Sequence, residues 1–349
     1  MSGAQYKVIL SHQISIKGEV LKKVLILGSN SFGATALIGD LLDSKWEVIG
    51  VSRSQIKEPL FLTYLANNKL TSFTFHQIDI VKQIEALYVL ISESKPEFIV
   101  DFAGQGMVAE SWFDPSSWYQ TNILSKVGLL EFLNREKLIE KYIRISTPEV
   151  YGNTVTEVYE TAAFNPSTPY ALSHATIDKH LELLNTRYGF PSVVGRFANF
   201  YGPGQQLYRI VPKTFMKFLS GSKIQLHGSG TSKRAFIHGA DVSSAIKSLM
   251  TLGRNGQTYH FSTRDFFSIS NLVGIIGAQL GLDWMKLTES VIDRPGKDNQ
   301  YLMNFSKSAY ELGWNPQVSF DQGLKEVESW ILKNFDALTK YSLEYKHVE

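Results

Sequence analysis

The chain has 349 residues, 44% of them hydrophobic and 19% charged, which is enough to bury one large core or two closely connected ones. Lys and Arg total 35 against 33 Asp and Glu, and a formal net charge of +2 without a long basic run argues against nucleic acid as the main partner. The absence of cysteine excludes disulfides, thiolate metal ligands and cysteine nucleophiles, and we assign no metal site.

Residues 1–21 form an extension before the first regular element. They contain a short apolar piece at 6–10, but not the basic region, long apolar region and small-residue cleavage site of a secretory signal. No apolar run of the chain reaches the ~18 residues of a membrane span. We therefore expect a cytoplasmic protein with no membrane partner.

Short apolar runs alternate with helix-length segments through the first 200 residues. The runs, typical of buried parallel strands, are 23–27, 47–51, 72–75, 98–102, 142–146 and 192–196. The helical segments include 34–42, 80–93, 116–131 and 170–187. This alternation predicts an α/β fold with a doubly wound parallel sheet of the Rossmann type, whose ligands bind at the carboxyl ends of the strands.

The alternation ends near residue 199, where Gly and Pro cluster at 201–204. We predict an NAD(P)-binding domain over residues 22–198, with a return segment near 236–252. A smaller C-terminal α+β substrate-binding domain would comprise 199–235 and 253–335, and residues 336–349 would form a tail.

The first predicted strand runs directly into a glycine-containing turn that opens a helix. Glycine permits the tight bend, and small residues let backbone amides approach a pyrophosphate at the helix N-terminus. A βα turn without a ligand is the alternative, but the position after the first strand favours a dinucleotide. Its predicted contacts here are Gly28, Ser31, Phe32 and Gly33.

The end of the second strand distinguishes NAD from NADP. An acidic residue there binds the ribose 2′-hydroxyl of NAD, whereas Arg accommodates the 2′-phosphate of NADP. The strand ends in Ser52-Arg53-Ser54, which favours NADP over NAD, with a solvated loop arginine as the alternative. Asp79, followed by Ile80, either accepts a hydrogen bond from the adenine amino group or caps the next helix.

Two motifs lie in the middle of the chain: Ser-Thr-Pro-Glu-Val-Tyr-Gly at 146–152 and Pro-Tyr-Ala-Leu-Ser-His at 169–174. Together with the stretches at 102–105, 120–122, 196–203 and 293–296, they make residues 23–332 resemble the extended short-chain dehydrogenase/reductase family. The resemblance is to its NAD(P)-dependent nucleotide-sugar epimerases and dehydratases, and two stretches closely match those of dTDP-glucose 4,6-dehydratases.

The resemblance implies an enzyme that oxidises C4 of a nucleotide-activated hexose with NAD(P) and eliminates water across C5 and C6. Tyr170 would take the proton of the 4-hydroxyl, helped by Thr147. The resulting ketone acidifies the C5 hydrogen, which Glu149 would remove. Loss of the 6-hydroxyl and return of the hydride at C6 would give a 4-keto-6-deoxy sugar.

The resemblance also assigns binding residues and an assembly. Cofactor contacts would be Ala103, Gly104, Asn122, Tyr170 and His174. Substrate contacts would be Gln105, Asn199, Arg209, His227, Arg234 and Arg294, where the planar fork of Arg suits a diphosphate. In the family, the helices corresponding to 116–131 and 170–187 pair across a two-fold axis, so we expect a homodimer.

Two residues depart from the family pattern. His174 stands where the family carries the Lys of Tyr-x-x-x-Lys, one helical turn from Tyr170. In the family, this Lys hydrogen-bonds the nicotinamide ribose, and its positive charge lowers the pKa of the Tyr. A histidine is mostly uncharged near neutral pH, so His174 would keep the hydrogen bond but lose most of the effect on the Tyr170 pKa. Lys179 cannot stand in, because nine residues place it on the opposite helix face. Pro148 replaces an Asp that resembles a general acid and cannot hydrogen-bond to a substrate, whereas GDP-mannose dehydratases let the Glu serve as base and acid.

Three functions are therefore compatible with the sequence. A nucleotide-sugar 4,6-dehydratase is favoured; a 4-epimerase or a uronate decarboxylase of the same family is the alternative, although Glu149 disfavours plain epimerisation. His174 and Pro148 motivate a third, a catalytically weak protein that binds nucleotide sugar. Lys297 and Gln300 replace a His and an Arg of the dTDP-glucose enzymes, so neither base nor hexose is assigned.

Overall fold

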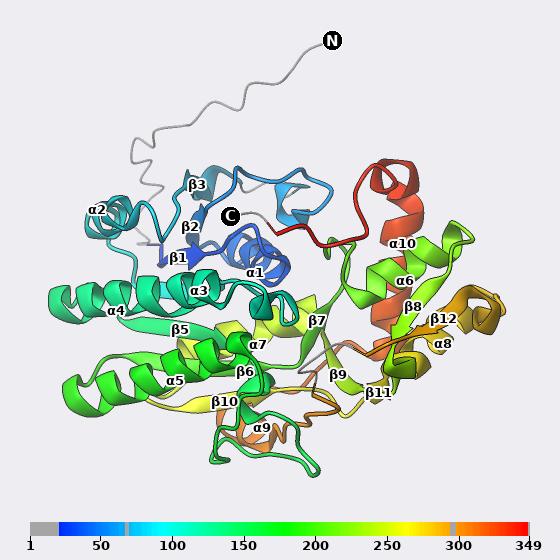
Figure 1. Cartoon of the computed structure of the whole chain (residues 1–349). Coiled ribbons are helices and arrows are strands. Elements are labelled where there is room, and N and C mark those ends of the chain that lie inside the picture. The colour runs from blue at the N-terminus through cyan, green and yellow to red at the C-terminus, as the bar shows by residue number, and fades with distance from the viewer. Residues whose placement is uncertain (1–20, 67–69, 294–297, 348–349) are drawn as a thin grey trace.

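Seven parallel strands form the central sheet (Figure 1). The computed structural model describes residues 21–66, 70–293 and 298–347. The strands are β1 (Lys23–Leu27), β2 (Glu47–Ser52), β3 (Phe73–Gln77), β4 (Phe98–Asp101), β5 (Lys141–Ser146), β6 (Ser192–Phe197) and β10 (Thr258–Phe261). Their order is β10-β6-β5-β4-β1-β2-β3, so the chain changes direction between β1 and β4. The predicted doubly wound parallel sheet is confirmed.

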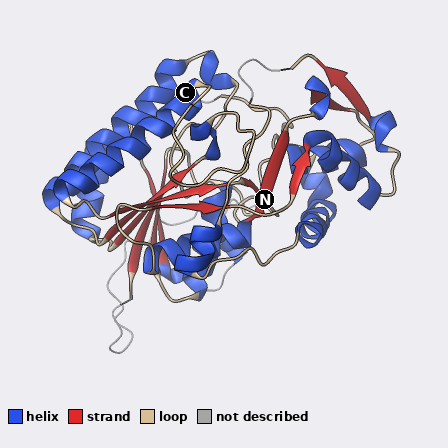
Figure 2. Ribbon diagram, turned by 90° about the horizontal axis from the view of Figure 1, so that it is seen from below, coloured by secondary structure: helices blue, strands red, loops and turns tan. Residues whose placement is uncertain are grey.

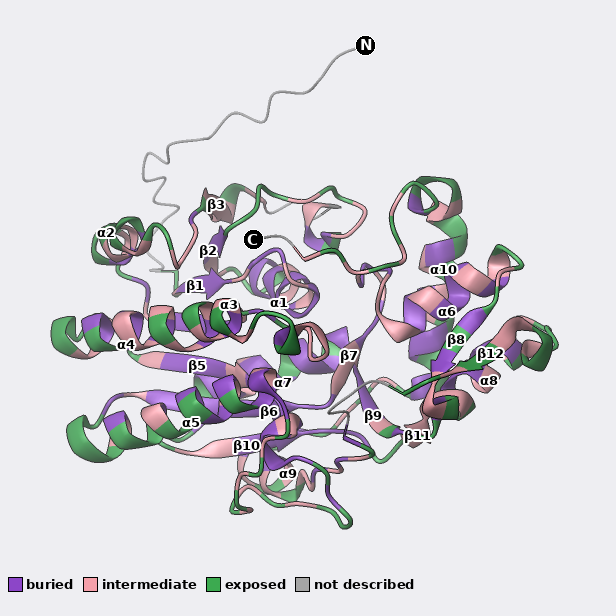
Figure 3. Cartoon of the chain, viewed as in Figure 1, coloured by how far each residue is buried: buried purple, intermediate pink, exposed green. Residues whose placement is uncertain are grey.

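Helices cover both faces of this sheet (Figure 2). α1 (Phe32–Asp43) and α7 (Gly239–Thr251) pack on one face. α2 (Ile84–Ser94), α4 (Ser125–Glu136) and α5 (Pro169–Tyr188) pack on the other. Because successive strand residues point to opposite faces, strands covered on both sides are apolar throughout, and the central strands are buried (Figure 3).

Local sequence explains how the helices near the motifs begin. Thr168 caps α5 by accepting a hydrogen bond from the backbone of Ala171, and Pro169 occupies the first turn, where its missing N–H costs nothing. The helix predicted over 116–131 is three connected pieces: α3 (Pro115–Tyr119), a π-helical turn (Gln120–Leu124) and α4. Such π-turns are frequent at functional sites.

A smaller α+β part lies beside the carboxyl ends of the central strands (Figure 1). It has a three-stranded sheet of β7 (Asn199–Tyr201), β9 (Lys233–His238) and β11 (Phe266–Ser268), and a pair of β8 (Ile224–His227) with β12 (Thr288–Val291). Three helices bury a separate apolar core there: α6 (Ile210–Leu219), α8 (Ile269–Gln279) and α10 (Phe320–Leu338). A short helix, α9 (Ser306–Leu312), returns to the central sheet, since Leu312 joins the core beneath α1 and α7.

The strand β10 corrects one predicted domain assignment. We placed residues 258–261 in the substrate-binding domain, but they pair in parallel with β6 at the edge of the central sheet. The run has four residues and includes a buried histidine, and its partner strand lies more than sixty residues earlier, so no local pattern reveals the pairing. The other domain limits stay a prediction, and residues 1–20 of the extension lie outside the described residues. No helix within the described ranges is long and apolar enough to cross a membrane.

Candidate active site

A cavity of ≈ 1480 Å³ lies at the carboxyl ends of the central strands. Its walls come from the loops after β1, β2, β4 and β5 and from α6, β8 and β9. The predicted site residues that line it are Gly28, Ser31, Phe32, Gly33, Ser52, Arg53, Asp79, Ile80, Ala103, Gly104, Gln105, Thr147, Glu149, Tyr170, His174, Asn199, Arg209, His227 and Arg234. Arg294 lies outside the described residues.

The glycine turn after β1 is held close to the loop after β4. Gly28 has φ +75°, and a Cβ there would lie 2.8 Å from the backbone nitrogen of Ala103, so only glycine is accommodated without strain. Ser31 caps α1, and the Ser52 hydroxyl accepts a hydrogen bond from the backbone of Asn30 at 3.0 Å. The turn therefore presents the start of α1 to the cavity, an arrangement that fits the pyrophosphate of a dinucleotide.

Cationic side chains lie beyond the end of β2, and the acidic Asp79 lies beyond the end of the neighbouring β3. Arg53 lines the cavity, and so does Lys57, which the sequence analysis did not single out. The Lys57 ammonium donates to the backbone oxygen of Asn30 at 3.1 Å, and burial lowers its pKa. Asp79 accepts hydrogen bonds from the backbone of Val81 and Lys82 in the turn before α2. The N-cap of α2 is Gln83, so Asp79 does not cap that helix as one prediction had it, and its contact with an adenine stays a prediction.

Asn122 corrects a prediction, because it does not line the cavity. Its side chain is fully buried in the π-helical turn and bonds to both backbone groups of Gln105, at 2.8 and 3.1 Å, and to the Ser173 hydroxyl at 3.0 Å. Lys126 similarly donates to the backbone oxygen of Ala103 at 2.7 Å. These two residues therefore fix the loop after β4 from behind.

The motif at 146–152 places its catalytic candidates through a short turn. β5 ends at Ser146, and Thr147 caps the 3₁₀ turn Pro148–Tyr151 by accepting from the backbone of Glu149. Pro148 occupies the first position of that turn, where no N–H is needed, and is buried. The turn brings Glu149 into the cavity beside Tyr170 from α5.

The Glu149 carboxyl is held near the midpoint of its titration at neutral pH. Burial raises its pKa to about 7 in spite of the opposing charge of Arg234. Tyr301, which the sequence analysis did not single out, lies with its hydroxyl 3.3 Å from Glu149 Oε1 and 3.4 Å from Asn199 Oδ1. The Tyr301 ring in turn packs 4.3 Å beneath the guanidinium of Arg234. No local sequence motif identifies Tyr301, because its hydrogen-bond partners Glu149 and Asn199 lie more than a hundred residues earlier.

Tyr170 and His174 lie side by side on α5, with ring centroids 4.6 Å apart. Burial raises the pKa of Tyr170 above its ordinary value, and the nearby charge of Glu149 raises it further. A hydrogen bond with Thr147 and the positive charges of Arg209 and Arg144 act in the opposite direction. Burial and Glu149 outweigh these groups, so the net pKa of Tyr170 is raised; the Thr147 hydrogen bond and the two arginines offset part of that rise.

The substrate-side residues are held by backbone contacts. Arg234 donates to the carbonyl oxygens of Lys233 and Asp298, and His227 contacts the backbone oxygen of Ile292 at 3.1 Å. Arg209 stands immediately before α6 and packs over the ring of Tyr208. Their roles toward a diphosphate stay predictions.

The C-terminal tail contributes to the cavity wall, which the sequence analysis did not foresee. Glu344 and Tyr345 line the cavity. Glu344 pairs with Lys213 of α6 at 2.8 Å, whereas the His347 ring stacks on Trp118 of α3 at 5.0 Å. The tail therefore connects the α+β part with the helices of the central sheet across the cavity.

Comparison with known proteins identifies the family. The family described as GDP-mannose 4,6 dehydratase matches residues 25–327. The chain belongs to this family. It is 30% identical to the dTDP-D-glucose 4,6-dehydratase of Mus musculus over 326 residues, 91% of each chain. The resemblance predicted from the motifs is thereby confirmed.

Two solved structures extend the comparison. A dTDP-glucose 4,6-dehydratase from Streptomyces venezuelae, crystallised with NAD, is 27% identical and superposes with a TM-score of 0.82, covering 90% of this chain and 98% of its own. A UDP-glucose 4-epimerase from Thermotoga maritima, crystallised with UDP-glucose, is 25% identical with a TM-score of 0.81, covering 90% and 99%. The fold is thus shared by dehydratases and epimerases, and the site residues must distinguish them.

Proposed function

We propose that the protein is a nucleotide-sugar 4,6-dehydratase that uses NAD or NADP. The observation that carries the proposal is the placement of Thr147, Glu149 and Tyr170 around one cavity at the end of β5, with the pKa of Glu149 raised to about 7. A cavity of ≈ 1480 Å³ is large enough for a dinucleotide together with a nucleotide sugar.

Tyr170 and Thr147 would act on the sugar C4 hydroxyl. A bound dinucleotide would accept the C4 hydride and return it at C6. Tyr170 takes the hydroxyl proton, and the hydrogen bond with Thr147 stabilises the tyrosinate that this requires. The turn after β1, with Gly28 and Gly33, would hold the pyrophosphate of that dinucleotide.

Glu149 would act both as base and as acid. As a carboxylate it removes the C5 proton next to the new ketone; the electron pair of that bond forms the C5–C6 double bond, and the 6-hydroxyl leaves. Pro148 has no proton to give, so the proton just taken by Glu149 goes to the leaving oxygen, which departs as water. When the hydride returns at C6, C5 takes up a proton from solvent, which balances the hydroxyl proton that Tyr170 removed. A pKa near 7 suits this double role, because carboxylate and acid are then comparably populated at neutral pH.

The choice of cofactor depends on the residues beyond β2. Arg53 and Lys57 line the cavity there and favour the 2′-phosphate of NADP. The Streptomyces dehydratase was crystallised with NAD. Titration of the unliganded protein with each dinucleotide decides between them.

The assembly we propose is a cytoplasmic homodimer. Leu172 and Leu183 of α5 are exposed at 45% and 66% and lie eleven residues apart, which places them on the same helix face. Leu124, the last residue of the π-helical turn before α4, is also 66% exposed. These apolar side chains support pairing through α4 and α5, and sedimentation analysis of the leucine-to-serine variants at 172 and 183 tests it, since dissociation to monomers is expected.

The decisive experiment follows the C5 hydrogen. The protein is incubated in deuterium oxide with dTDP-, GDP-, UDP- and CDP-hexoses, and products are analysed by mass spectrometry and NMR. We expect one substrate to give a 4-keto-6-deoxy product with deuterium at C5, and Glu149→Gln to abolish both elimination and exchange. Neither turnover nor exchange with any of them would contradict the proposal. An epimer without C5 deuterium, or carbon dioxide released from a uronate, would assign the protein to the alternative activities instead.

A further inference from the structure

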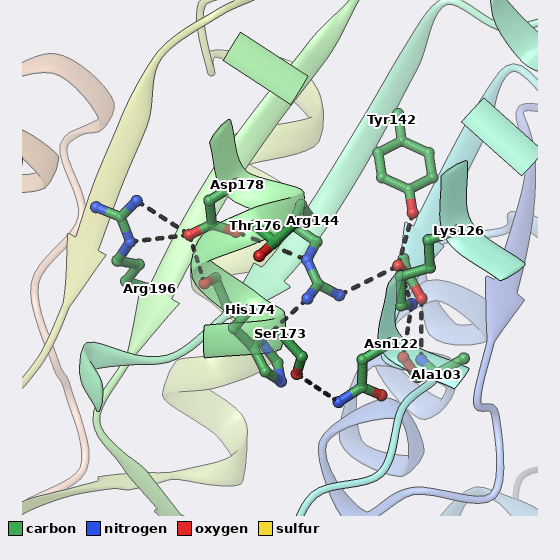
Figure 4. Close-up of polar contacts among 12 residues, drawn as sticks. Ala103, Asn122, Lys126, Tyr142, Arg144, Ser173, His174, Thr176, Asp178 and Arg196 are labelled. Atoms are coloured by element: carbon green, nitrogen blue, oxygen red, sulfur yellow. Dashed lines mark hydrogen bonds and ion pairs between the residues drawn. The ribbon is translucent and has the colours of Figure 1, made fainter. Parts of the chain in front are cut away.

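A buried arginine contacts the histidine that departs from the family's Tyr-x-x-x-Lys pattern. Arg144 lies on β5, three residues before Thr147, and its side chain is 1% exposed. Its Nη2 atom lies 3.0 Å from Nδ1 of His174 (Figure 4). A cation therefore stands next to the position where the family has one, although it comes from a different element of the fold.

The direction of this hydrogen bond fixes the protonation of His174. A guanidinium has only donors, so Nδ1 of His174 must be the acceptor, and the proton of the neutral ring is on Nε2. Burial lowers the pKa of His174 well below its ordinary value, and the charges of Arg144 and Lys126 lower it further. His174 lines the cavity, so a neutral ring offers a ligand a single defined donor, Nε2–H.

Five ionisable groups surround this ring. They lie on four elements: Tyr170 and Asp178 on α5, Arg144 on β5, Lys126 on α4 and Asp101 on β4. The two carboxylates contact Arg144 rather than His174, so they hold the arginine and leave the ring neutral. Lys179, on the opposite face of α5, pairs with Glu182 at 2.7 Å and takes no part.

Arg144 is held by two buried carboxylates, each of which also pairs with a second cation. Its Nη1 atom is 3.3 Å from Asp101, and its Nε atom is 3.8 Å from Asp178. Asp101 also binds Lys126 at 2.5 Å, and Asp178 also binds Arg196 at 3.0 Å (Figure 4). If Arg144 is removed, each carboxylate therefore keeps a cation, and the protein should still fold.

We propose that Arg144 and His174 together replace the lysine of the family pattern. Arg144 is a positioning residue that holds His174 as an Nε2–H donor toward the nicotinamide ribose. Arg144 also supplies the positive charge that favours the tyrosinate form of Tyr170. The inference rests on the proposed function, in which Tyr170 is the base. The sequence led us to expect that the positive charge near Tyr170 is lost with His174, whereas in the structure Arg144 provides that charge. The lowering of the Tyr170 pKa by Arg144 is in accord with this.

The first test needs no turnover. In the unliganded protein labelled with ¹⁵N-histidine, with His174→Asn used to assign the signal, we expect an unprotonated Nδ1 and a protonated Nε2 from pH 5.5 to 8.5. Arg144→Met removes the donor and the charge at similar volume. In this variant we expect His174 to titrate within that range or to mix tautomers, and the dinucleotide dissociation constant to rise several-fold. An unchanged tautomer in Arg144→Met would overturn the proposal.

The second test uses the active enzyme. At neutral pH we expect Arg144→Met to lower kcat by on the order of 10- to 100-fold, because the buried charge that favours the tyrosinate form of Tyr170 is lost. Arg144→Lys, which keeps the charge, should recover part of the loss. Tyr142→Phe is the matched control: it removes a hydrogen bond to the same Asp101 without touching His174, and should leave tautomer and kcat unchanged. A similar kcat loss in Tyr142→Phe would show that the effect of Arg144 is merely structural.

The third test restores the family arrangement. In the presence of Arg144, His174→Lys buries two cations side by side, so we expect no increase in kcat. In the double variant Arg144→Met/His174→Lys, the lysine should recover at least about 10-fold over Arg144→Met. A double variant no more active than Arg144→Met would contradict the replacement. If the wild-type protein turns over no nucleotide sugar, the proposed function fails, whereas the ¹⁵N spectra still decide whether Arg144 fixes His174.

Discussion

Replacing Tyr301 with phenylalanine removes the hydroxyl that lies 3.3 Å from Glu149. The substitution keeps the ring beneath the Arg234 guanidinium, so the shape of the site should be preserved. A hydrogen bond to a carboxylate stabilises its charged form, and its loss must raise the pKa of Glu149 above the present value of about 7. Since Glu149 must be ionised to take the C5 proton, activity in the variant should require a higher pH.

The size of the effect follows from the hydrogen-bond length. Hydrogen bonds to charged groups contribute about 1.5–3 kcal/mol, but 3.3 Å is long for an O–H donor. We therefore assign roughly 1 kcal/mol, which corresponds to about 0.7 pKa unit. With that shift the ionised fraction of Glu149 falls about five-fold at pH 6 and by less than about a tenth at pH 9.

The assay is the pH dependence of kcat/KM for C5 exchange, which reports the free enzyme. The control is Tyr64→Phe, because the buried Tyr64 hydroxyl has no hydrogen-bond partner among the described residues and lies in the core beneath the central sheet. The control should leave the acidic limb in place. An acidic limb that stays near pH 7 in Tyr301→Phe, or a loss of activity equal at pH 6 and pH 9, would refute the role assigned to this hydroxyl.

Three further outcomes are expected. Gly28→Ala should lower the free energy of unfolding by about 2 kcal/mol in thermal denaturation and weaken dinucleotide binding, because φ is +75° and the added Cβ would lie 2.8 Å from a backbone nitrogen. Arg53→Glu should reduce NADP affinity by on the order of 100-fold in a titration while changing NAD affinity much less, if a 2′-phosphate binds there; equal losses would exclude that role. A chain ending at Lys340 lacks Glu344 and Tyr345 from the cavity wall and should show a KM raised by on the order of 10-fold with kcat less affected; an unchanged KM would show that the tail does not contact substrate.

The sequence by itself determined the features that depend on neighbouring residues. Strands buried on both faces must be apolar throughout, so six of the central strands were visible as short apolar runs. The turn at Gly28 could be read because it directly follows the first strand, and the catalytic candidates Thr147, Glu149 and Tyr170 because they stand in two compact motifs. All of these residues line the cavity.

The tertiary structure decided everything that depends on distant pairing. Strand β10 joins the sheet only through β6, and Tyr301 reaches Glu149 from 152 residues away. Arg144 interrupts an apolar strand, which was a usable signal, but its partners Asp101, Asp178 and His174 come from two other elements, β4 and α5. Local periodicity reports which face of an element is buried and carries no information on what packs against it. For that reason the sequence exposed the missing lysine at position 174, and only the fold revealed the arginine beside it.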